Sequence, residues 1–362
     1  MSKISESLVF THIIYIPPST TERSKKPRSA TTERSQKSTV LDEPTTIERK
    51  QQKKQILKFV ARTLEKMPQG LRAEFSTMKR YNDFEKMKAF KNAQENGKNR
   101  YKDVGCLDNN RVKLNSPWPH EYIHANYVAV PTNPQRFICT QAPLEKTCAD
   151  FWYMCLQERV EFIFMLCNLT EKGSKKCYEY YPNKKKDVLE FEEGGQKITV
   201  KLESSSQFQF RAPDAKAKVI ASEVLIEGPG GNSLKTIHYH WNDWPDRGVP
   251  AADMAILELL DQARPSKGPI VVHCSAGIGR TGSVVMLEYV MDQLISGQSI
   301  EDGDKILVKI REQRNNSIQT DAQYLFVHQV ILNYFRKKKL MEEAGVQEAH
   351  DAFIEQYKKS VV

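Results

Sequence analysis

The distribution of apolar residues divides the chain near residue 47. From Pro17 to Thr46 the sequence is rich in Ser, Thr, Lys, Arg, Gln and Pro and has few large apolar side chains. Such a segment cannot bury enough apolar surface to offset the conformational entropy that is lost on ordering. We therefore expect residues 1–46 to form a disordered Ser/Thr/Lys-rich tail, which is either inert and solvated or a target of phosphorylation.

The first part of this tail contains a short apolar run, Leu8–Ile16, with the sequence LVFTHIIYI and interruptions at Thr11 and His12. The run is much shorter than the roughly 20 apolar residues that a membrane-spanning helix needs. It also lacks the cleavage region of a secretory signal. A short strand, a docking peptide and an unordered terminus all remain open for it.

A helical pattern begins at about Ile47. Ile56, Leu57, Val60 and Leu64 recur at spacings of three and four residues, which is typical of one apolar face of a helix. The sequence therefore predicts that the folded part of the protein starts with a helix. We expect a single domain over residues 47–340 and a C-terminal helical extension over residues 341–362.

Apolar runs and helical patterns alternate irregularly after this point. Strands are predicted at Phe162–Cys167, Ile198–Leu202 and Ile270–Val272, and helices at 281–296 and near Glu342–Lys358. The apolar residues that we expect to face inward from the helix at 281–296 are Val284, Leu287, Val290, Met291 and Leu294. This mixture favours the α/β class, with a twisted mixed central sheet flanked by helices, over a repeat array.

Composition and charge narrow the class of protein. A hydrophobic fraction of 40% and a charged fraction of 27% are those of a globular protein. The net charge of +9 favours anionic partners, such as phosphorylated proteins, nucleic acid or acidic membranes, without choosing among them. No stretch is long and apolar enough to predict a transmembrane segment.

The cysteines are odd in number and scattered. No two form a CxxC pair, so the sequence predicts neither a zinc site nor a disulfide framework. A reducing compartment, and hence a cytoplasmic location, is the simplest interpretation. The seven cysteines are Cys106, Cys139, Cys148, Cys155, Cys167, Cys177 and Cys274.

The most specific pattern is IVVHCSAGIGRTG at 270–282. An apolar strand leads into a loop from His273, and a helix begins at about Arg280. Backbone N–H groups and the positive end of a helix dipole then meet at the loop, which forms a cradle for a phosphoryl group. The loop residues that we expect to line this cradle are Ser275, Ala276, Gly277, Ile278 and Gly279.

The same cradle favours the thiolate form of Cys274 and so lowers the pKa of its thiol below the free-cysteine value of about 8.5. The thiolate can then act as a nucleophile. Arg280 offers a planar fork for two phosphoryl oxygens. Thr281 can donate a hydrogen bond from its hydroxyl to the sulfur and so help the thiolate to leave when a bond to the sulfur breaks. The alternative is a buried structural cysteine in a glycine-rich turn. Five residues between Cys274 and an Arg-Thr pair that opens a helix favour the functional interpretation.

The segment HCSAGIGRTG resembles the signature loop of the protein tyrosine phosphatase family, in its tyrosine-specific, non-receptor branch. Lipid phosphatases of the superfamily carry lysines within this loop, and the present sequence has none there. The resemblance extends over roughly Ile56–Phe335. It implies the phosphatase-like α/β fold and hydrolysis of phosphotyrosine through a cysteinyl-phosphate intermediate.

The resemblance also assigns a general acid. The segment HYHWNDWPDRGVP lies about thirty residues before Cys274 and is similar to the movable acid loop of the family. It implies that Asp246 is the general acid and later the general base, while Trp244 shapes the closing loop. Taken alone, Trp-Pro-Asp is more often an ordinary turn.

Further positions are implied in the same way. SIQTDAQYLF supplies Gln319, which is expected to hold the hydrolytic water, and Gln323, which with Thr320 also resembles a helix capping box. KNRYKDVGCL resembles the loop that selects phosphotyrosine: Tyr101 stacks on the substrate ring and Asp103 holds the substrate backbone. Supporting roles are implied for Glu171, paired with Arg280, and for Lys176, close to Asp246.

The sequence departs from the family pattern at structural positions: Ala142 replaces a glycine, Glu121 an aspartate, His124 an asparagine and Tyr181 a tryptophan, and Asn316 lies where some members carry glycine. None of these is a predicted catalytic residue. We therefore expect altered local packing, or an altered peptide preference in the case of Asn316, with intact chemistry.

Three alternatives compete with an active tyrosine phosphatase. A catalytically dead phosphotyrosine-binding module would have lost the nucleophile, acid or arginine, and all three are present. An enzyme that also accepts phosphoserine needs a shallower site than the Tyr101 loop implies. Nucleic-acid binding would need clustered basic motifs with interleaved aromatics, which are absent. We expect phosphotyrosine proteins as partners, no nucleic acid, and no metal or other cofactor, while the oligomeric state stays open.

Overall fold

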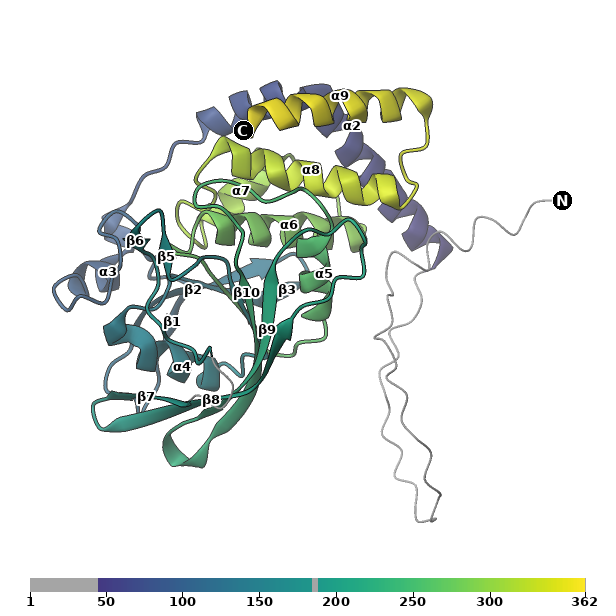
Figure 1. Ribbon diagram of the computed structural model, residues 1–362. Helices are drawn as coiled ribbons and strands as arrows, with labels where there is room; N and C mark the ends of the chain where they lie inside the picture. Colours follow the sequence, from purple (N-terminus) through teal and green to yellow (C-terminus); the bar gives the residue numbers. More distant parts are fainter. Residues whose placement is uncertain (1–44, 184–187, 362) are drawn as a thin grey trace, which may run out of the picture.

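The computed structural model describes residues 45–183 and 188–361 (Figure 1). The predicted tail, residues 1–46, lies outside this part of the chain except for Thr45 and Thr46, and so does the apolar run Leu8–Ile16. Among the helices of the described ranges, none combines the length and apolar character that crossing a bilayer requires.

The strands of the described residues are β1 (Arg111–Lys113), β2 (Tyr122–Val130), β3 (Asn133–Thr140), β4 (Phe162–Met165), β5 (Thr170–Glu171), β6 (Ser174–Lys175), β7 (Val188–Glu193), β8 (Gln196–Gln207), β9 (Val219–Glu227), β10 (Ser233–Trp241) and β11 (Ile270–His273). The helices are α2 (Thr46–Thr77), α3 (Lys88–Asn92), α4 (Cys148–Gln157), α5 (Ala255–Gln262), α6 (Arg280–Ile295), α7 (Gly303–Arg311), α8 (Asp321–Lys337) and α9 (Ala344–Ser360), with short 3-10 turns at η1 (Phe84–Lys86), η2 (Glu145–Thr147) and η3 (Pro229–Gly231).

Nine of these strands form one mixed sheet in the order β1-β2-β3-β11-β4-β10-β9-β8-β7, and β5 and β6 form a separate hairpin. The four central strands, β3, β11, β4 and β10, run parallel, whereas the outer pairs are antiparallel. The carboxyl ends of the parallel strands therefore meet at one edge of the sheet. The loops that follow them carry most of the predicted site residues.

The predicted fold class, a twisted mixed sheet with flanking helices, is confirmed. The strand expected at Phe162–Cys167 ends at Met165, the one at Ile198–Leu202 is the middle of the longer β8, and the one at Ile270–Val272 extends to His273. The helix expected at 281–296 is α6, and its five predicted inward-facing residues are all buried.

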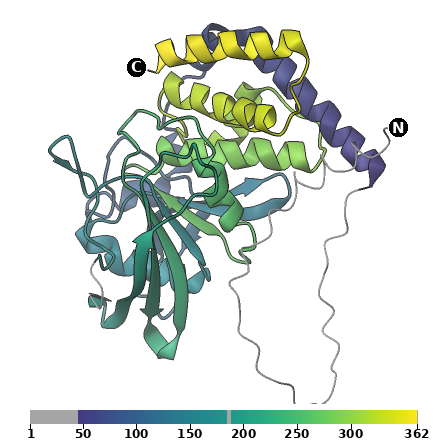
Figure 2. The same ribbon diagram turned by 45° about the vertical axis from the view of Figure 1, so that its right-hand side comes forward.

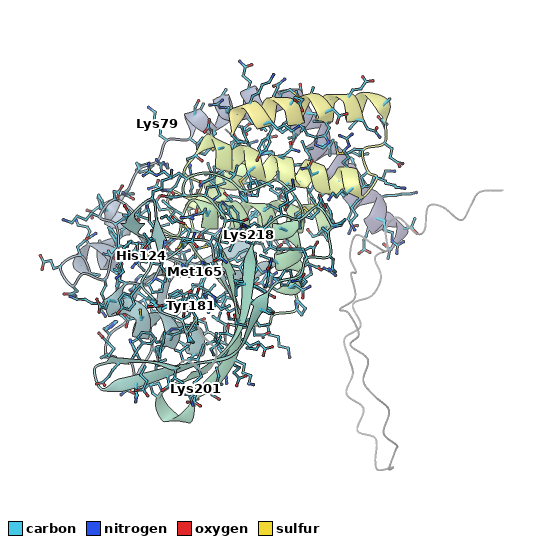
Figure 3. The ribbon with its side chains drawn as sticks, in the orientation of Figure 1. Lys79, His124, Met165, Tyr181, Lys201 and Lys218 are labelled. Atoms are coloured by element: carbon cyan, nitrogen blue, oxygen red, sulfur yellow. The ribbon has the colours of Figure 1, made fainter. Side chains whose placement is uncertain are left out.

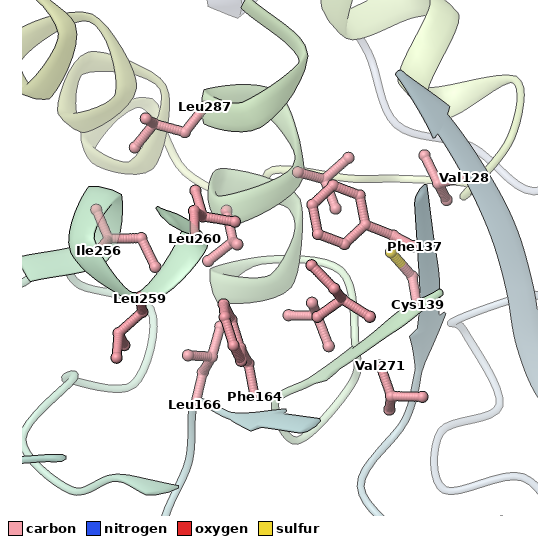
Figure 4. Packing of buried hydrophobic residues seen from close by; sticks show 14 of the residues in the cluster. Val128, Phe137, Cys139, Phe164, Leu166, Ile256, Leu259, Leu260, Val271 and Leu287 are labelled. Atoms are coloured by element: carbon pink, nitrogen blue, oxygen red, sulfur yellow. The ribbon is translucent and has the colours of Figure 1, made fainter. Parts of the chain in front are cut away.

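Helix α6 lies between the sheet and helices α2, α7 and α8. Nearly all of its residues are buried, which is typical of a helix with no solvent face. Its buried Glu288 forms an ion pair with Arg136 at 3.0 Å, so this charge is compensated. Figure 4 shows this part of the core, in which Leu287 of α6 lies with residues of α5 and of the strands; the other labelled residues are Val128, Phe137, Cys139, Phe164, Leu166, Ile256, Leu259, Leu260 and Val271.

Helices α8, α2 and α9 pack outside α6 (Figures 1 and 2). The helix predicted from Ile47 is α2, which kinks where Met67 is non-helical and Pro68 follows. Ile56, Val60 and Leu64 are buried as the pattern indicates. Leu57 is different, with 41% of its surface exposed, because it lies about 100° around the helix from Ile56 and off the packed face.

Candidate active site

The loop between β11 and α6 packs closely on its surroundings at two of its glycines. Gly277 has φ of +70°, and a Cβ there would lie 2.0 Å from the carbonyl oxygen of Thr140. A Cβ at Gly279 would lie 2.5 Å from Oε1 of Gln319. Gly277 therefore requires glycine, because its neighbour is backbone and its φ is positive, and this glycine lets the loop pack against the end of β3. At Gly279 the neighbour is the end of the flexible Gln319 side chain, which lies against the loop.

The carbonyl oxygens of four successive loop residues accept hydrogen bonds from outside the loop. The donors are Ala142 N–H to Ser275 at 3.0 Å, the Arg314 guanidinium to Ala276 at 3.3 Å and to Gly277 at 3.0 Å, and Ile318 N–H to Ile278 at 2.9 Å. In a planar trans peptide the N–H points away from the C=O. The N–H groups of this loop therefore point inward and form an anion-binding concavity.

The sulfur of Cys274 faces this concavity. Gly277 N–H donates a hydrogen bond to Sγ at 3.2 Å, and Cys274 is 3% exposed. Burial by itself raises the pKa of the thiol, but the positive charge of Arg280 and hydrogen bonds from Thr281 and Gly277 outweigh burial and lower it below the ordinary value. Cys139 lacks such donors, and burial raises its pKa to about 12. Of the two thiols, only Cys274 is suited to be a thiolate.

Thr281 lies beside the sulfur at the start of α6. Its hydroxyl is fully buried and makes no well-formed hydrogen bond with any described residue. Its backbone N–H and hydroxyl nevertheless contribute to lowering the pKa of Cys274. A buried hydroxyl with an unused donor is suited to stabilise a negative charge that develops on the sulfur.

Arg280 is buried, and a carboxylate holds its guanidinium. Nη1 and Nη2 donate to the two oxygens of Glu171 at 2.6 and 2.8 Å, which forms a bidentate pair. Nη1 also donates to the carbonyl oxygen of Trp244 at 3.0 Å. Burial opposes the charge of Arg280, but Glu171 and Cys274 outweigh it and raise the pKa. The ion pair expected between Glu171 and Arg280 is present.

The loop after β10 brings Asp246 to the same place. Its carboxylate accepts a hydrogen bond from Lys176 Nζ at 3.0 Å and lies 3.5 Å from the Arg280 guanidinium. Burial raises the pKa of Asp246, but Lys176, Arg280 and Arg247 together outweigh it and hold the pKa below its usual value. A carboxylate therefore stands at the mouth of the cradle.

Trp244 anchors this loop. Its indole is 1% exposed and packs edge-on between Trp241 and Phe326, with ring centroids 5.0 and 5.5 Å away. A turn follows, closed by Gly248 N–H donating to the carbonyl oxygen of Pro245 at 3.2 Å. The part of the loop that carries Asp246 is therefore short, and the buried Trp244 fixes its start.

Two glutamines approach the cradle from the start of α8. Gln319 N–H donates to Oε1 of Gln323 at 2.9 Å, and Nε2 of Gln323 is buried with no partner among the described residues. The Thr320 hydroxyl accepts from Gln323 N–H at 3.2 Å. The expected capping box is therefore only half formed, because the Gln323 side chain binds the Gln319 backbone instead of that of Thr320.

Tyr101 forms one wall of the site. Its hydroxyl lies 2.8 Å from Oγ of Ser275, which itself donates to the carbonyl oxygen of Lys176 at 3.0 Å. Its ring packs against the small apolar cluster of Val104, Ala276 and Ile278. An aromatic wall beside Cys274 is suited to pack against a flat substrate ring.

Asp103, two residues further on, is exposed, and its carbonyl oxygen accepts a hydrogen bond from the Asn82 side chain at 2.9 Å. The same Asn82 side chain accepts from Asn315 at 2.8 Å and from Asn316 at 3.2 Å. These amides join the loop of Asp103 to the loop that leads to Gln319. Asn82 and Asn315 were not predicted from the sequence, because asparagines in loops carry no distinctive pattern, and Asn316 was noted only as a departure from the family.

His273 supports the loop from beneath. Its Nε2 lies 2.7 Å from the hydroxyl of Tyr180, which also contacts His238 at 2.6 Å. Burial lowers the pKa of His273 to about 3, so the ring is neutral. A neutral ring in this position orders the loop and adds no charge to the cradle.

Arg314 is a site residue that sequence reasoning missed. Although fully buried, it holds two loop carbonyls and also donates to Asn126 Oδ1 at 2.9 Å and to Nδ1 of His124 at 3.2 Å. Nε2 of His124 lies 2.8 Å from the Val104 carbonyl oxygen, so these partners assign the proton to Nε2. The family departure at His124 is thus fully hydrogen-bonded, and burial together with Arg314 lowers its pKa to about 3.

A second polar cluster lies away from the cradle. Within the described residues, His120, Asp150 and Glu193 come close enough to hold a metal ion. The ammonium of Lys98 lies 3.1 Å from both carboxylates, however, and Trp118 donates to Asp150 at 2.8 Å. Lys98 therefore already supplies the positive charge at this place.

The comparisons with known proteins agree on one family. The family model described as protein-tyrosine phosphatase matches residues 95–333. Receptor-type tyrosine-protein phosphatase zeta of Rattus norvegicus is 34% identical over 70% of this chain, and tyrosine-protein phosphatase non-receptor type 12 of Homo sapiens is 32% identical over 70%. The chain covers 11% and 32% of the lengths of these two relatives.

A solved structure shows the same fold. The crystal structure of the catalytic domain of human protein tyrosine phosphatase non-receptor type 18 is 28% identical, with a TM-score of 0.59, over 67% of this chain and 85% of that chain. In the present protein, His124, Met165 and Tyr181 lie within the body of the domain, where all three are buried, and Lys79 lies at its periphery (Figure 3). The resemblance inferred from the signature loop is confirmed, and the chain belongs to the protein-tyrosine phosphatase family.

Proposed function

We propose that the protein hydrolyses phosphotyrosine in other proteins and acts through a phosphorylated Cys274. The observation that carries this proposal is the set of contacts around one sulfur. Cys274 has a lowered pKa, faces inward-pointing N–H groups and lies beside an arginine that Glu171 holds, with Asp246 3.5 Å from that arginine. A nucleophile, an anion cradle and a proton carrier are thus present together.

In the first step, the thiolate of Cys274 attacks phosphorus. The S–P bond forms as the bond from phosphorus to the tyrosyl oxygen breaks, and Asp246 gives its proton to that oxygen. Asp246 must be protonated at this stage, although Lys176 and Arg280 lower its pKa in the ligand-free protein. A bound phosphoryl dianion compensates the charge of Arg280 and raises the pKa of Asp246, so substrate binding favours the protonated acid.

In the second step, water hydrolyses the phosphocysteine. Asp246, now ionised, takes a proton from the water, whose oxygen attacks phosphorus as the S–P bond breaks. The proposed holder of this water is Gln319, whose side-chain Oε1 lies against the cradle at Gly279. The buried Nε2 of Gln323 offers a further donor to bound phosphate. Thr281 stabilises the departing thiolate.

Selectivity for phosphotyrosine is assigned to Tyr101. The ring forms a wall of the site with Val104 and Ile278 and is tied through its hydroxyl to Ser275. A short phosphoserine side chain would have to bring the substrate backbone into this wall to reach Cys274. Asp103 is exposed beside it and can accept hydrogen bonds from the backbone of a bound peptide. The proposed partners are therefore phosphotyrosine proteins of signalling pathways.

A cytoplasmic location is part of the proposal. All seven cysteines are free thiols in the structure, and all are buried. Thiols that are retained without any disulfide suit a reducing compartment. A thiolate nucleophile also needs such a compartment to stay reduced.

The test is hydrolysis of a phosphotyrosine peptide and of a matched phosphoserine peptide by the wild type, Cys274→Ser and Asp246→Asn. We expect turnover of phosphotyrosine only, no turnover by Cys274→Ser, and a decrease of about 10²–10⁴-fold in kcat for Asp246→Asn. Cys148→Ser is the matched control, because its hydroxyl can keep the contact with the Leu144 carbonyl oxygen. Peptide binding without turnover by the wild type would instead indicate a phosphotyrosine-binding module.

A further inference from the structure

Among the residues that the structure describes, the first half of α2 is contacted on one side only. Gln52 donates to the carbonyl oxygen of Ile295, and Oε1 of Gln55 accepts from Ile300 N–H at 3.0 Å. Phe59 is 5% exposed and stacks on the ring of His328, with ring centroids 5.9 Å apart. These contacts fix the helix firmly against the α6–α7 connection and α8. Figure 2 shows this half of α2 extending past the ends of α8 and α9.

The opposite side of the same half carries lysines and two exposed aliphatic side chains. Lys50, Lys53 and Lys54 are exposed and Lys58 is half-exposed. Together with the exposed residues Ile47 and Leu57 they lie within about 140° of the helix circumference. We call this set the lysine face; its residues are Ile47, Lys50, Lys53, Lys54, Leu57 and Lys58.

The positive charge of this face is not compensated within the described residues. None of the four lysines has a carboxylate within ion-pairing distance there, whereas Lys235 pairs with Glu203 at 2.5 Å and Lys309 with Glu301 at 2.7 Å elsewhere on the surface. Glu48, the neighbouring acid, is occupied at the helix start, where it accepts from Thr45 N–H at 2.6 Å. The lysine face therefore presents four positive charges to a partner.

The aliphatic residues distinguish between anionic partners. Ile47 is 79% exposed and Leu57 41%, so water contacts much of both side chains. No aromatic ring lies on this face to stack on bases. Its cations are lysines, which lack the planar guanidinium that binds phosphates and bases of nucleic acid in a bidentate manner. A bilayer with anionic headgroups offers negative charge and, just beneath it, an apolar layer for aliphatic side chains.

We propose that the lysine face of α2 is a docking surface for anionic lipid membranes, with Lys50, Lys53, Lys54 and Lys58 on the headgroups and Ile47 and Leu57 in the outer acyl layer. Lysine stems allow the charged ends to reach the headgroups while the helix lies along the surface. Because the inner side of this helix is packed against the domain, docking would bring the domain to the membrane. The proposal does not depend on the proposed enzymatic activity.

The test is cosedimentation of the full chain with vesicles of phosphatidylcholine alone and with vesicles that also contain phosphatidylserine. We expect binding to the anionic vesicles only, with a decrease at high ionic strength. Replacing all four lysines by glutamine should weaken binding about fivefold for each lysine, or roughly 600-fold in total. Replacing Ile47 and Leu57 by serine should weaken it while leaving the dependence on salt.

The matched control removes the same charge elsewhere. Lys91, Lys146, Lys216 and Lys267 are exposed and lie on other segments, so their joint replacement by glutamine should change binding far less than the α2 variant does. Thermal unfolding midpoints equal to that of the wild type show that the variants are folded.

Equal binding by the α2 variant and the wild type would overturn the proposal, because the contact would then lie in another part of the chain. Binding of the wild type to single-stranded RNA or to an acidic peptide, with no binding to anionic vesicles, would also overturn it.

Discussion

At the scale of single residues, the chemistry of the site depends on opposing contributions at two atoms. Burial disfavours the thiolate of Cys274, and Arg280, Thr281 and Gly277 reverse that effect. Burial likewise disfavours the carboxylate of Asp246, and Lys176 and Arg280 reverse it. These neighbours favour the charged form of both groups, so the pKa values of Cys274 and Asp246 depend on identifiable contacts.

One of these neighbours, Lys176, can be removed without touching the cradle. The hydrogen bond from Lys176 lowers the pKa of Asp246, so in Lys176→Met that pKa rises. Asp246 acts first as a protonated acid, and a higher pKa keeps it protonated to higher pH. We therefore expect the basic limb of the pH profile of kcat/KM to move to higher pH.

The control for this change is Lys175→Met, because Lys175 lies 4.7 Å over the ring of Tyr178 and has no contact with Asp246. Its pH profile should match that of the wild type. A profile for Lys176→Met that keeps the wild-type basic limb would mean that Lys176 does not set the pKa of the acid.

At the scale of elements, the position of the site follows from the parallel strands at the centre of the sheet. The loops after β11 and β10 meet at one edge because their strands point the same way. The loop after β11 packs tightly against the end of β3. A Cβ added at Gly277 would lie 2.0 Å from the carbonyl oxygen of Thr140. Loop conformation and sheet packing are thus coupled at this glycine.

Gly277→Ala tests this coupling. The substitution combines a positive φ with a clash against backbone, so we expect it to cost about 2–4 kcal/mol of folding free energy and to abolish turnover. The matched control is Gly195→Ala, where φ is +76° and an added Cβ meets nothing within 4 Å. It should cost about 1–2 kcal/mol and leave kcat unchanged. Denaturant unfolding and peptide hydrolysis measure the two effects; equal costs at both glycines would refute the packing argument.

At the scale of the whole molecule, the ends of the described chain close over the helical side of the domain. Helix α9 packs on α2 and α8, and its Phe353 and Tyr357 belong to the same buried cluster as residues of the sheet. The division predicted from the sequence, with a separate extension over residues 341–362, stays a prediction. The packing instead leads us to propose that α9 stabilises the entire domain.

Phe353→Ala distinguishes the two possibilities. Phe353 is fully buried, and its truncation should lower the free energy of unfolding by about 3–5 kcal/mol. Denaturant unfolding followed by tryptophan fluorescence is the measurement, because Trp152, Trp241 and Trp244 are buried far from α9 in sequence. Glu348→Ala, an exposed change on the same helix, should shift stability by less than about 0.5 kcal/mol. If only helical circular dichroism is lost while the tryptophan transition is unchanged, α9 is an appendage.

Features that depend on residues close together in the chain could be predicted without the structure. The strand, loop and helix around Cys274, the helix at 281–296 and the turn that carries Asp246 could be predicted because their residues are close together in the chain and their spacing is informative. The pair of Glu171 and Arg280 was expected only through a family resemblance, because its members are 109 positions apart.

The positions of the remaining residues depend on packing between segments that are far apart in the chain. Arg314 stands in the polar segment REQRNN, which is typical of a solvated surface, yet it is buried because loop carbonyls and Asn126 satisfy its guanidinium. Leu57 fits the apolar pattern of its helix, yet it is exposed because α8 and the α6–α7 connection cover the adjacent face. In both cases the environment comes from segments distant in the chain, and local spacing carries no information about which of them will pack there.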